Sequence, residues 1–119
     1  MARILLADDD KGALDLVRRA LETDGHTVTT AEDGTEAFAC LERASFDVLV
    51  TDVQMPGLDG IALADKALTL APGMRLVLMS GYADVLDRAK AIKATHMKLV
   101  SKPFSIEQMR KEIRDALAE

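Results

Sequence analysis

Short apolar runs alternate with longer stretches of helical period along the chain. Four or five consecutive apolar residues are typical of a buried strand, whereas apolar residues at i, i+3 and i+7 mark one face of a helix. The first two segments predict a strand over residues 4–7 and a helix over residues 11–23, capped by Asp10 and ended before Gly25. Five such rounds follow one another, and this alternation predicts βαβ units around a parallel sheet.

The later segments continue this order. The strand expected over residues 26–30 is β-branched but polar, which favours an edge of the sheet, whereas the strand over 47–51 is apolar on both faces, which favours its centre. We therefore predict an α/β fold with helices on both faces of a parallel sheet. The other expected elements are a helix after Gly34 carrying Ala37, Phe38 and Leu41, a helix over 61–70, a strand over 76–79, a helix over 85–94, a strand over 99–100, and a helix over 106–117 that buries Ile106, Met109, Ile113 and Leu117.

The composition is that of an ordinary globular protein. The 119 residues are 49% apolar and 29% charged, which suits one domain over residues 1–119 without an output domain. The formal net charge of −5 and the scattered basic residues argue against nucleic-acid binding. The single cysteine, Cys40, allows no internal disulfide, and no signal peptide or membrane span is recognised, so we expect a cytoplasmic protein with no membrane partner.

Polar side chains follow the predicted strands at the point where each strand ends. Asp8 and Asp9 follow the first strand, Asp52 the third, Ser80 the fourth and Lys102 the fifth. Because parallel strands present their carboxyl ends at one edge, we expect these groups to converge there. Clustered carboxylates with a nearby backbone carbonyl suit Mg²⁺. Asp52 can then act as a nucleophile toward a phosphoryl group, with Lys102 and Ser80 binding its oxygens, to give an aspartyl phosphate.

Four segments together resemble the marker segments of bacterial response-regulator receiver domains. They are residues 5–10, 51–60, 80–81 and 101–104, and the resemblance spans nearly the whole chain. It implies a flavodoxin-like (βα)5 receiver fold with strand order 2-1-3-4-5. It also implies phosphorylation of Asp52 by a histidine kinase or a histidine phosphotransferase. The protein would catalyse its own phosphorylation and dephosphorylation, without being an enzyme for a separate substrate.

The same resemblance implies roles for further residues. It places Mg²⁺ at Asp9, Asp52 and the backbone carbonyl of Gln54, with Asp8 in the outer sphere. It also implies a structural role for Gly60 and a cis peptide before Pro103, consistent with cis bonds being largely a property of proline.

Within this family, the chain is similar to stand-alone receivers of the CpdR type. Residues 3–7, 79–83 and 99–103 and the chain length carry this similarity. Such receivers take phosphoryl groups from a histidine phosphotransferase and, when unphosphorylated, prime the ClpXP protease. The similarity implies a monomer whose output is a phosphorylation-dependent contact with another protein. A phosphorelay intermediate that passes phosphate on without a protease role stays open as an alternative.

Signal output from the site should differ from the common receiver pattern. Leu99 occupies the place where receivers usually carry a switching aromatic residue, and Tyr82 is the only tyrosine of the chain. Our hypothesis is that Ser80 and Tyr82 together report the state of Asp52 through the loop that follows the fourth strand. The face formed by the fourth helix, the fifth strand and the last helix would then be the output surface.

Three other functions are compatible with parts of the sequence. A phosphatase of the haloacid-dehalogenase type also uses an Asp after an apolar strand, but it requires a second Asp where this chain has Gln54. A flavodoxin-like electron carrier would bind its flavin phosphate in the first loop, where residues 8–10 are all Asp and would repel it. A purely scaffolding protein would neither bind Mg²⁺ nor accept a phosphoryl group.

Overall fold

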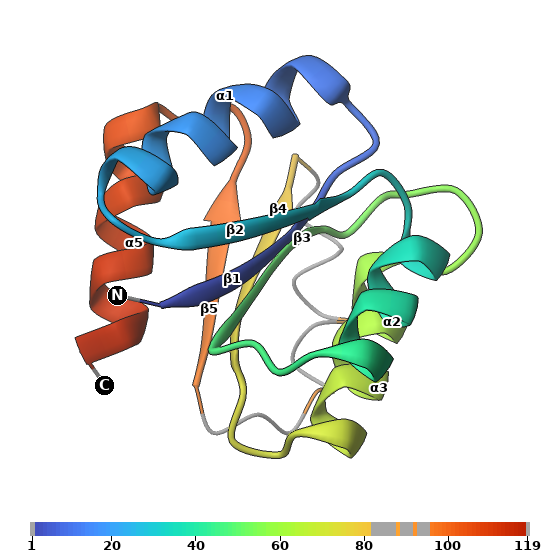
Figure 1. Ribbon diagram of the computed structural model, residues 1–119. Helices are drawn as coiled ribbons and strands as arrows, with labels where there is room; N and C mark the ends of the chain where they lie inside the picture. The colour runs from blue at the N-terminus through green and yellow to red at the C-terminus, as the bar shows by residue number, and fades with distance from the viewer. Residues whose placement is uncertain (1, 82–87, 89–91, 93–95, 119) are drawn as a thin grey trace.

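The computed structural model describes residues 2–81, 88, 92 and 96–118. These residues form one parallel sheet in the order β2-β1-β3-β4-β5, with α1 and α5 on one face and α2 and α3 on the other (Figure 1). The predicted α/β fold and strand order are therefore confirmed. The strands are β1 Arg3–Ala7, β2 Thr27–Ala31, β3 Val48–Asp52, β4 Arg75–Ser80 and β5 Met97–Ser101, and the helices are α1 Lys11–Thr23, α2 Gly34–Arg43, α3 Gly60–Leu70 and α5 Ile106–Ala118.

The central strand β3 is buried along its whole length, as its apolar sequence predicted. Successive side chains of a strand point to opposite faces of the sheet. Val48 and Val50 accordingly belong to the core layer under α1 and α5, while Leu49 belongs to the layer under α2 and α3. The strand begins one residue later than predicted. Asp47 lies before it and accepts a hydrogen bond at Oδ2 from the backbone amide of Arg3 at 2.8 Å.

The two outer strands are less buried than the centre. β2 is half-buried and forms one edge of the sheet, as predicted from its polar residues. β5 forms the other edge and is longer than predicted, because its pairing with β4 runs from Met97 to Ser101. On this edge strand Leu99 is 39% exposed.

Side-chain caps mark the start of α1 and α3, and the sequence indicated the first of them. Asp10 accepts hydrogen bonds from the amides of Gly12 and Ala13 at the start of α1, and Asp59 accepts one from Ala62 at the start of α3. The helix predicted over residues 85–94 lies outside the described residues, apart from Arg88 and Ile92, so its prediction is not tested.

The core-facing side of α5 differs in part from its prediction. Met109 and Ile113 are buried as predicted, whereas Ile106 and Leu117 are only half-buried and pack at the margin of the core. Ala116 is buried in addition, because at this point the small side chain and not Leu117 faces the sheet.

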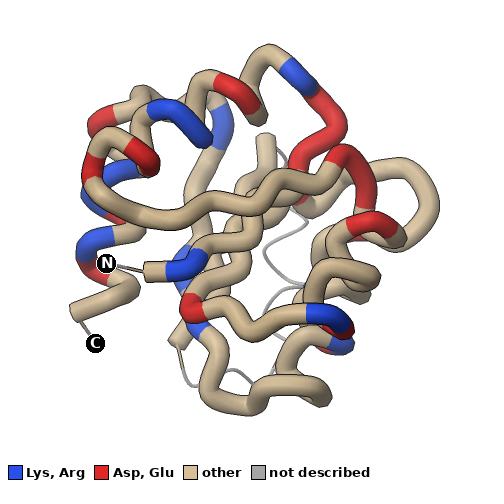
Figure 2. Tube along the Cα trace, in the orientation of Figure 1, with Lys and Arg blue, Asp and Glu red and all other residues tan. Residues whose placement is uncertain are grey.

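Charged residues are distributed unevenly over the fold. Acidic residues gather in the loops that follow β1 and β2, at the carboxyl end of the sheet, whereas α1 and α5 carry both signs (Figure 2). No helix in the described part of the chain is long and apolar enough to cross a membrane. Acidic residues therefore predominate at this end of the sheet, where Lys11 pairs with Glu32 and Lys102 pairs with Asp8 and Asp52.

Candidate functional site

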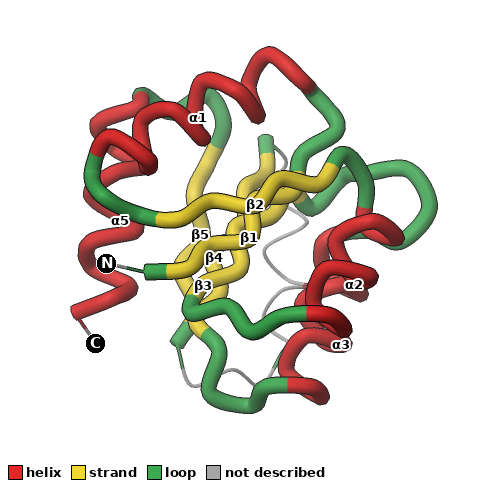
Figure 3. Tube along the Cα trace, viewed as in Figure 1, coloured by secondary structure: helices red, strands yellow, loops and turns green. Residues whose placement is uncertain are grey.

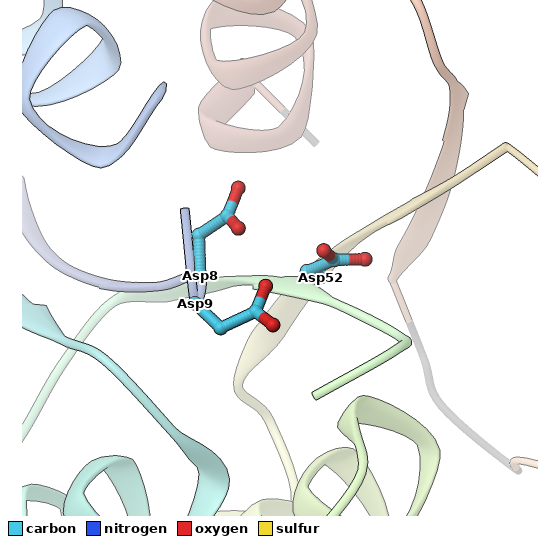
Figure 4. Close-up of side chains that lie close together, drawn as sticks. All are labelled: Asp8, Asp9 and Asp52. Atoms are coloured by element: carbon cyan, nitrogen blue, oxygen red, sulfur yellow. The ribbon is translucent and has the colours of Figure 1, made fainter. Parts of the chain in front are cut away.

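The carboxyl ends of β1 and β3 bring three aspartates together. Ala7 pairs with Thr51 in the parallel ladder, so Asp8 and Asp52 come next to each other on neighbouring strands. The loops after β1 and β3 lie at this same end of the sheet (Figure 3). Asp9 completes the group, and one carboxylate oxygen from each aspartate lies within 4.8 Å of the others (Figure 4).

Lys102 adds the positive charge of the site from the end of β5. Its Nζ lies 2.9 Å from Asp52 Oδ2 and 3.8 Å from Asp8 Oδ2. Its backbone amide donates to the carbonyl of Ser80 at 2.9 Å, which ties it to the end of β4. The peptide between Lys102 and Pro103 is cis. The ammonium therefore approaches the acids from a backbone that is anchored to the sheet.

Backbone amides hold the two buried aspartates. Asp52 Oδ1 accepts from the amide of Gln54 at 3.2 Å, and Asp8 Oδ1 accepts from the amide of Asp10 at 3.0 Å. Asp8 and Asp52 are both buried, whereas Asp9 is exposed. Each buried carboxylate thus has one oxygen fixed by its own loop and the other directed toward Lys102.

The surroundings of Asp8 and Lys102 raise the pKa of each group. Burial is the largest cause that raises the pKa of Asp8, and the charges of Asp52 and Asp9 act in the same direction. The amide of Asp10 and the charge of Lys102 lower the pKa of Asp8, but they do not cancel this rise. Burial by itself would lower the pKa of Lys102, yet its hydrogen bond to Asp52 and the charges of the three carboxylates outweigh burial and raise that pKa.

The donor set fits a hard divalent cation. The cluster contains three carboxyl groups and one ammonium, so the acidic groups outnumber the basic one. Mg²⁺ prefers oxygen ligands and is held by a small number of carboxylates together with water. One carboxylate oxygen from each of Asp8, Asp9 and Asp52 can hold such an ion. The finer assignment that the resemblance implies, with the Gln54 carbonyl as a ligand and Asp8 in the outer sphere, stays a prediction.

Gly60 is required by close packing behind the site. A Cβ atom at this position would lie 2.2 Å from the backbone oxygen of Asp52, which is less than any real contact distance. The start of α3 therefore packs directly against the backbone of the central aspartate. Asp59 Oδ2 also accepts a hydrogen bond from Arg88 at 2.8 Å, a contact that no sequence pattern signals.

Six of the predicted site residues fall into three groups. Asp8, Asp9, Asp52 and Lys102 meet in one cluster. Ser80 is buried at the end of β4, one strand away from Asp52 and beside the strand that carries Lys102. Tyr82 lies outside the described residues, so its predicted switching role has no structural test.

The sequence did not single out Thr51, the residue that precedes Asp52. Thr51 is fully buried, and its hydroxyl donates to the backbone oxygen of Asp52 at 2.9 Å. The only available signal was a hydroxyl within an apolar run, and such a residue is common in strands.

Comparisons with known proteins agree with this geometry. Residues 4–114 match the model of the response regulator receiver domain. The chain is 35% identical to the response regulator receiver protein CpdR of Brucella abortus (strain 2308), with 98% of both proteins covered. It is 32% identical to the C4-dicarboxylate transport transcriptional regulatory protein DctD of Rhizobium meliloti (strain 1021), but it spans only 25% of that protein.

A solved structure of a response regulator has a similar fold. The fold is similar to that of the chemotaxis response regulator CheY4 of Vibrio cholerae, with a TM-score of 0.89, 28% identity and 98% coverage of both chains. Flavodoxins share the strand order 2-1-3-4-5, so the match to the receiver family, and not the fold alone, favours a receiver over a flavin carrier. The chain belongs to the family of response regulator receiver domains of two-component signalling.

Proposed function

We propose that this receiver accepts a phosphoryl group on Asp52 from a phosphohistidine of a histidine kinase or histidine phosphotransferase. The observation that carries the proposal is the cluster of Asp8, Asp9 and Asp52 with Lys102 at 2.9 Å from Asp52 Oδ2. A buried carboxylate beside an anchored ammonium and two further acids is suited to binding a cation and a phosphoryl group together. Family membership supports a phosphodonor kinase as partner.

The transfer step follows from the contacts of Asp52. One carboxylate oxygen of Asp52 forms a bond to phosphorus while the P–N bond of the donor breaks. The electron pair of that bond stays on the donor imidazole, whose other nitrogen carries the proton. Asp52 Oδ1 is held by the Gln54 amide, so Oδ2 is the oxygen that can attack once Lys102 moves from it to a phosphoryl oxygen.

The other residues neutralise and bind the transferred group. Asp9, Asp52 and the Gln54 carbonyl would hold Mg²⁺, with Asp8 in its outer sphere. The bound ion would supply positive charge to the phosphoryl oxygens. Ser80 would donate a hydrogen bond from its hydroxyl to a phosphoryl oxygen. Dephosphorylation is a separate step, in which water attacks phosphorus while the bond from phosphorus to the Asp52 oxygen breaks. The water oxygen and its remaining proton leave with phosphate, the other proton goes to solvent, and the Asp52 carboxylate is restored. The protein thus promotes both steps on itself and is not an enzyme for a separate substrate.

The proposed output is a contact with another protein that depends on phosphorylation. Similarity to CpdR over nearly the full length of both chains is compatible with control of the ClpXP protease. In this proposal the unphosphorylated form is the active one, as the resemblance implies. The relay alternative uses the same site chemistry, and only the next acceptor differs. A receiver monomer acting in the cytoplasm suits both outputs.

A small P–N donor tests the acceptor chemistry without a cognate kinase. Phosphoramidate and Mg²⁺ should convert the wild type to a form that migrates more slowly in phosphate-affinity electrophoresis. Chelation of Mg²⁺ or the Asp52→Asn substitution should prevent this change. Conversion of Asp52→Asn at the wild-type rate would exclude Asp52 as the acceptor.

The output is tested with purified ClpXP and the same two proteins. Unphosphorylated wild type and Asp52→Asn should bind ClpX, and phosphorylated wild type should not. Equal binding of all forms, or of none, would reject control of ClpXP. Transfer of phosphate from the wild type to a histidine phosphotransferase would then favour the relay function.

A further inference from the structure

Every polar backbone group between the Asp52 carbonyl and the Gln54 amide is hydrogen-bonded. The bonds are Thr51 Oγ1 to Asp52 O at 2.9 Å, Val53 N to Met79 O at 3.0 Å, Gly60 N to Val53 O at 2.9 Å, and Gln54 N to Asp52 Oδ1 at 3.2 Å. The next polar group along the backbone is the Gln54 carbonyl, the proposed metal ligand. The backbone that leads to this carbonyl, from the Asp52 oxygen to the Gln54 amide, is therefore held by four hydrogen bonds.

The Thr51 hydroxyl belongs to an apolar environment. Thr51 is fully buried and lies on the same face of β3 as Leu49, toward α2 and α3. A buried hydroxyl needs a partner, and this one has a single proton to donate. Met55 Sδ lies 3.9 Å away, but a thioether is a weak acceptor, so the proton goes to the Asp52 carbonyl at 2.9 Å.

The Asp52 carbonyl is confined from two sides. The Thr51 hydroxyl binds it, and Gly60 packs so close to it that a Cβ atom would lie 2.2 Å away. In the series of four bonds, two join backbone groups and one uses the acceptor carboxylate itself. Only Thr51 contributes a side chain that lies outside the acid cluster, so its hydroxyl can be removed without changing the charge of the site.

From this arrangement we infer that Thr51 is a positioning residue for the Gln54 carbonyl. By holding the peptide plane that follows Asp52, the hydroxyl would restrain the backbone segment that leads to the Gln54 carbonyl. This inference rests on the proposed function, because it assigns the regulation of metal affinity at the same site. Loss of the hydroxyl should weaken metal binding while leaving the acids in place.

The test compares Thr51→Val, which keeps the β-branched shape, with Thr51→Ser, which keeps the hydroxyl. Binding of Mn²⁺ is measured by electron paramagnetic resonance, and Mg²⁺ by competition. Since one hydrogen bond contributes roughly a factor of 3–10 in an equilibrium constant, Thr51→Val should bind either metal about 3- to 10-fold more weakly. Thr51→Ser should bind within about twofold of the wild type.

A kinetic measurement separates positioning from general damage. In Thr51→Val, the Mg²⁺ concentration that gives half-maximal phosphorylation by acetyl phosphate should rise by the same factor. The rate at saturating Mg²⁺ should stay close to that of the wild type, because Asp52 and Lys102 are unchanged. Met55→Leu removes the alternative acceptor of the hydroxyl and should leave metal affinity unaltered.

Several results would overturn the inference. Wild-type Mn²⁺ affinity in Thr51→Val would do so, as would a Thr51→Ser protein no better than Thr51→Val, or a weakened Met55→Leu. If Thr51→Val does not fold, Thr51→Ala and Thr51→Ser form a second pair that differs in the hydroxyl alone, and equal affinity in that pair would reject the inference. A wild type that neither binds Mn²⁺ nor accepts phosphate would instead reject the proposed function, before any variant is compared.

Discussion

Replacing Asp8 by Asn should stabilise the metal-free protein at neutral pH. Asp8 is buried beside two other carboxylates, and its pKa is raised, so its ionised form is unfavourable in the folded state. Asn keeps the shape and the oxygen that accepts from the amide of Asp10. The substitution therefore removes a charge with little change in packing.

The magnitude follows from the distances in the site. Each neighbouring carboxylate has an oxygen within 4.8 Å, and at an effective dielectric of about 20 each repels Asp8 by about 3 kcal/mol. Lys102, at 3.8 Å, attracts Asp8 by about 4 kcal/mol. The net repulsion is about 2 kcal/mol; burial adds to it, and the hydrogen bond from the Asp10 amide to the carboxylate offsets part of it. Asp8→Asn should therefore raise the free energy of unfolding by about 1–3 kcal/mol at pH 7.

The pH dependence has a definite sign. Because the folded pKa of Asp8 lies above its ordinary value of 3.8, the folded state binds this proton more tightly than the unfolded state. The stability associated with Asp8 is therefore complete below pH 3.8 and is lost as the pH rises through the raised folded value. The advantage of Asp8→Asn should accordingly be largest at neutral pH and disappear toward pH 3.8.

Urea unfolding with a metal chelator, followed by circular dichroism, measures this effect. For a domain of this size the midpoint should rise by roughly 1 M at pH 7. Asp10→Asn is the matched control, because it removes an exposed charge but keeps the helix cap, and it should change the midpoint little. A midpoint for Asp8→Asn that is unchanged or lower at pH 7 would refute the electrostatic reasoning.

Two further substitutions test packing and surface electrostatics. Gly60→Ala should lower the free energy of unfolding by about 2 kcal/mol or more, because its Cβ would overlap the Asp52 backbone oxygen. Gly73→Ala is the control and should be near neutral, because a Cβ there would meet nothing within 4 Å. Equal urea midpoints for the two variants would contradict this reasoning. Arg110→Met should lower the midpoint at pH 7, because Arg110 makes two hydrogen bonds to Asp24 and lowers its pKa. This stability is present above pH 3.8 and is lost as the pH falls through the lowered folded pKa of Asp24, so a deficit that persists in strong acid would rule out this origin.

Local signals explain which parts of the fold were predicted well. The helix expected over residues 11–23 agrees with α1, because the Asp10 cap and Gly25, which has a φ of 93°, mark its ends within the sequence itself. The observed ends of the strands differ from the predicted ends by one or more residues. The extent of β5 depends on its pairing with β4 and includes polar residues that no apolar pattern selects.

The site was predictable in composition but not in its contacts. Parallel strands present their carboxyl ends together, so Asp8, Asp52 and Lys102 were expected to meet. That Lys102 binds Asp52 more closely than Asp8 depends on side-chain packing, which strand polarity does not determine. Contacts between distant residues were missed for the same reason, such as Arg110 with Asp24, which are 86 residues apart.

Mass spectrometry of the protein after treatment with acetyl phosphate and Mg²⁺ decides whether Asp52 is the phosphoryl acceptor. We predict a gain of one phosphoryl mass that requires Mg²⁺, maps to Asp52 after reductive trapping and peptide digestion, and is absent from Asp52→Asn. No gain of mass, or a gain located at another residue, would contradict the proposal that the aspartate cluster forms a phosphorylation site.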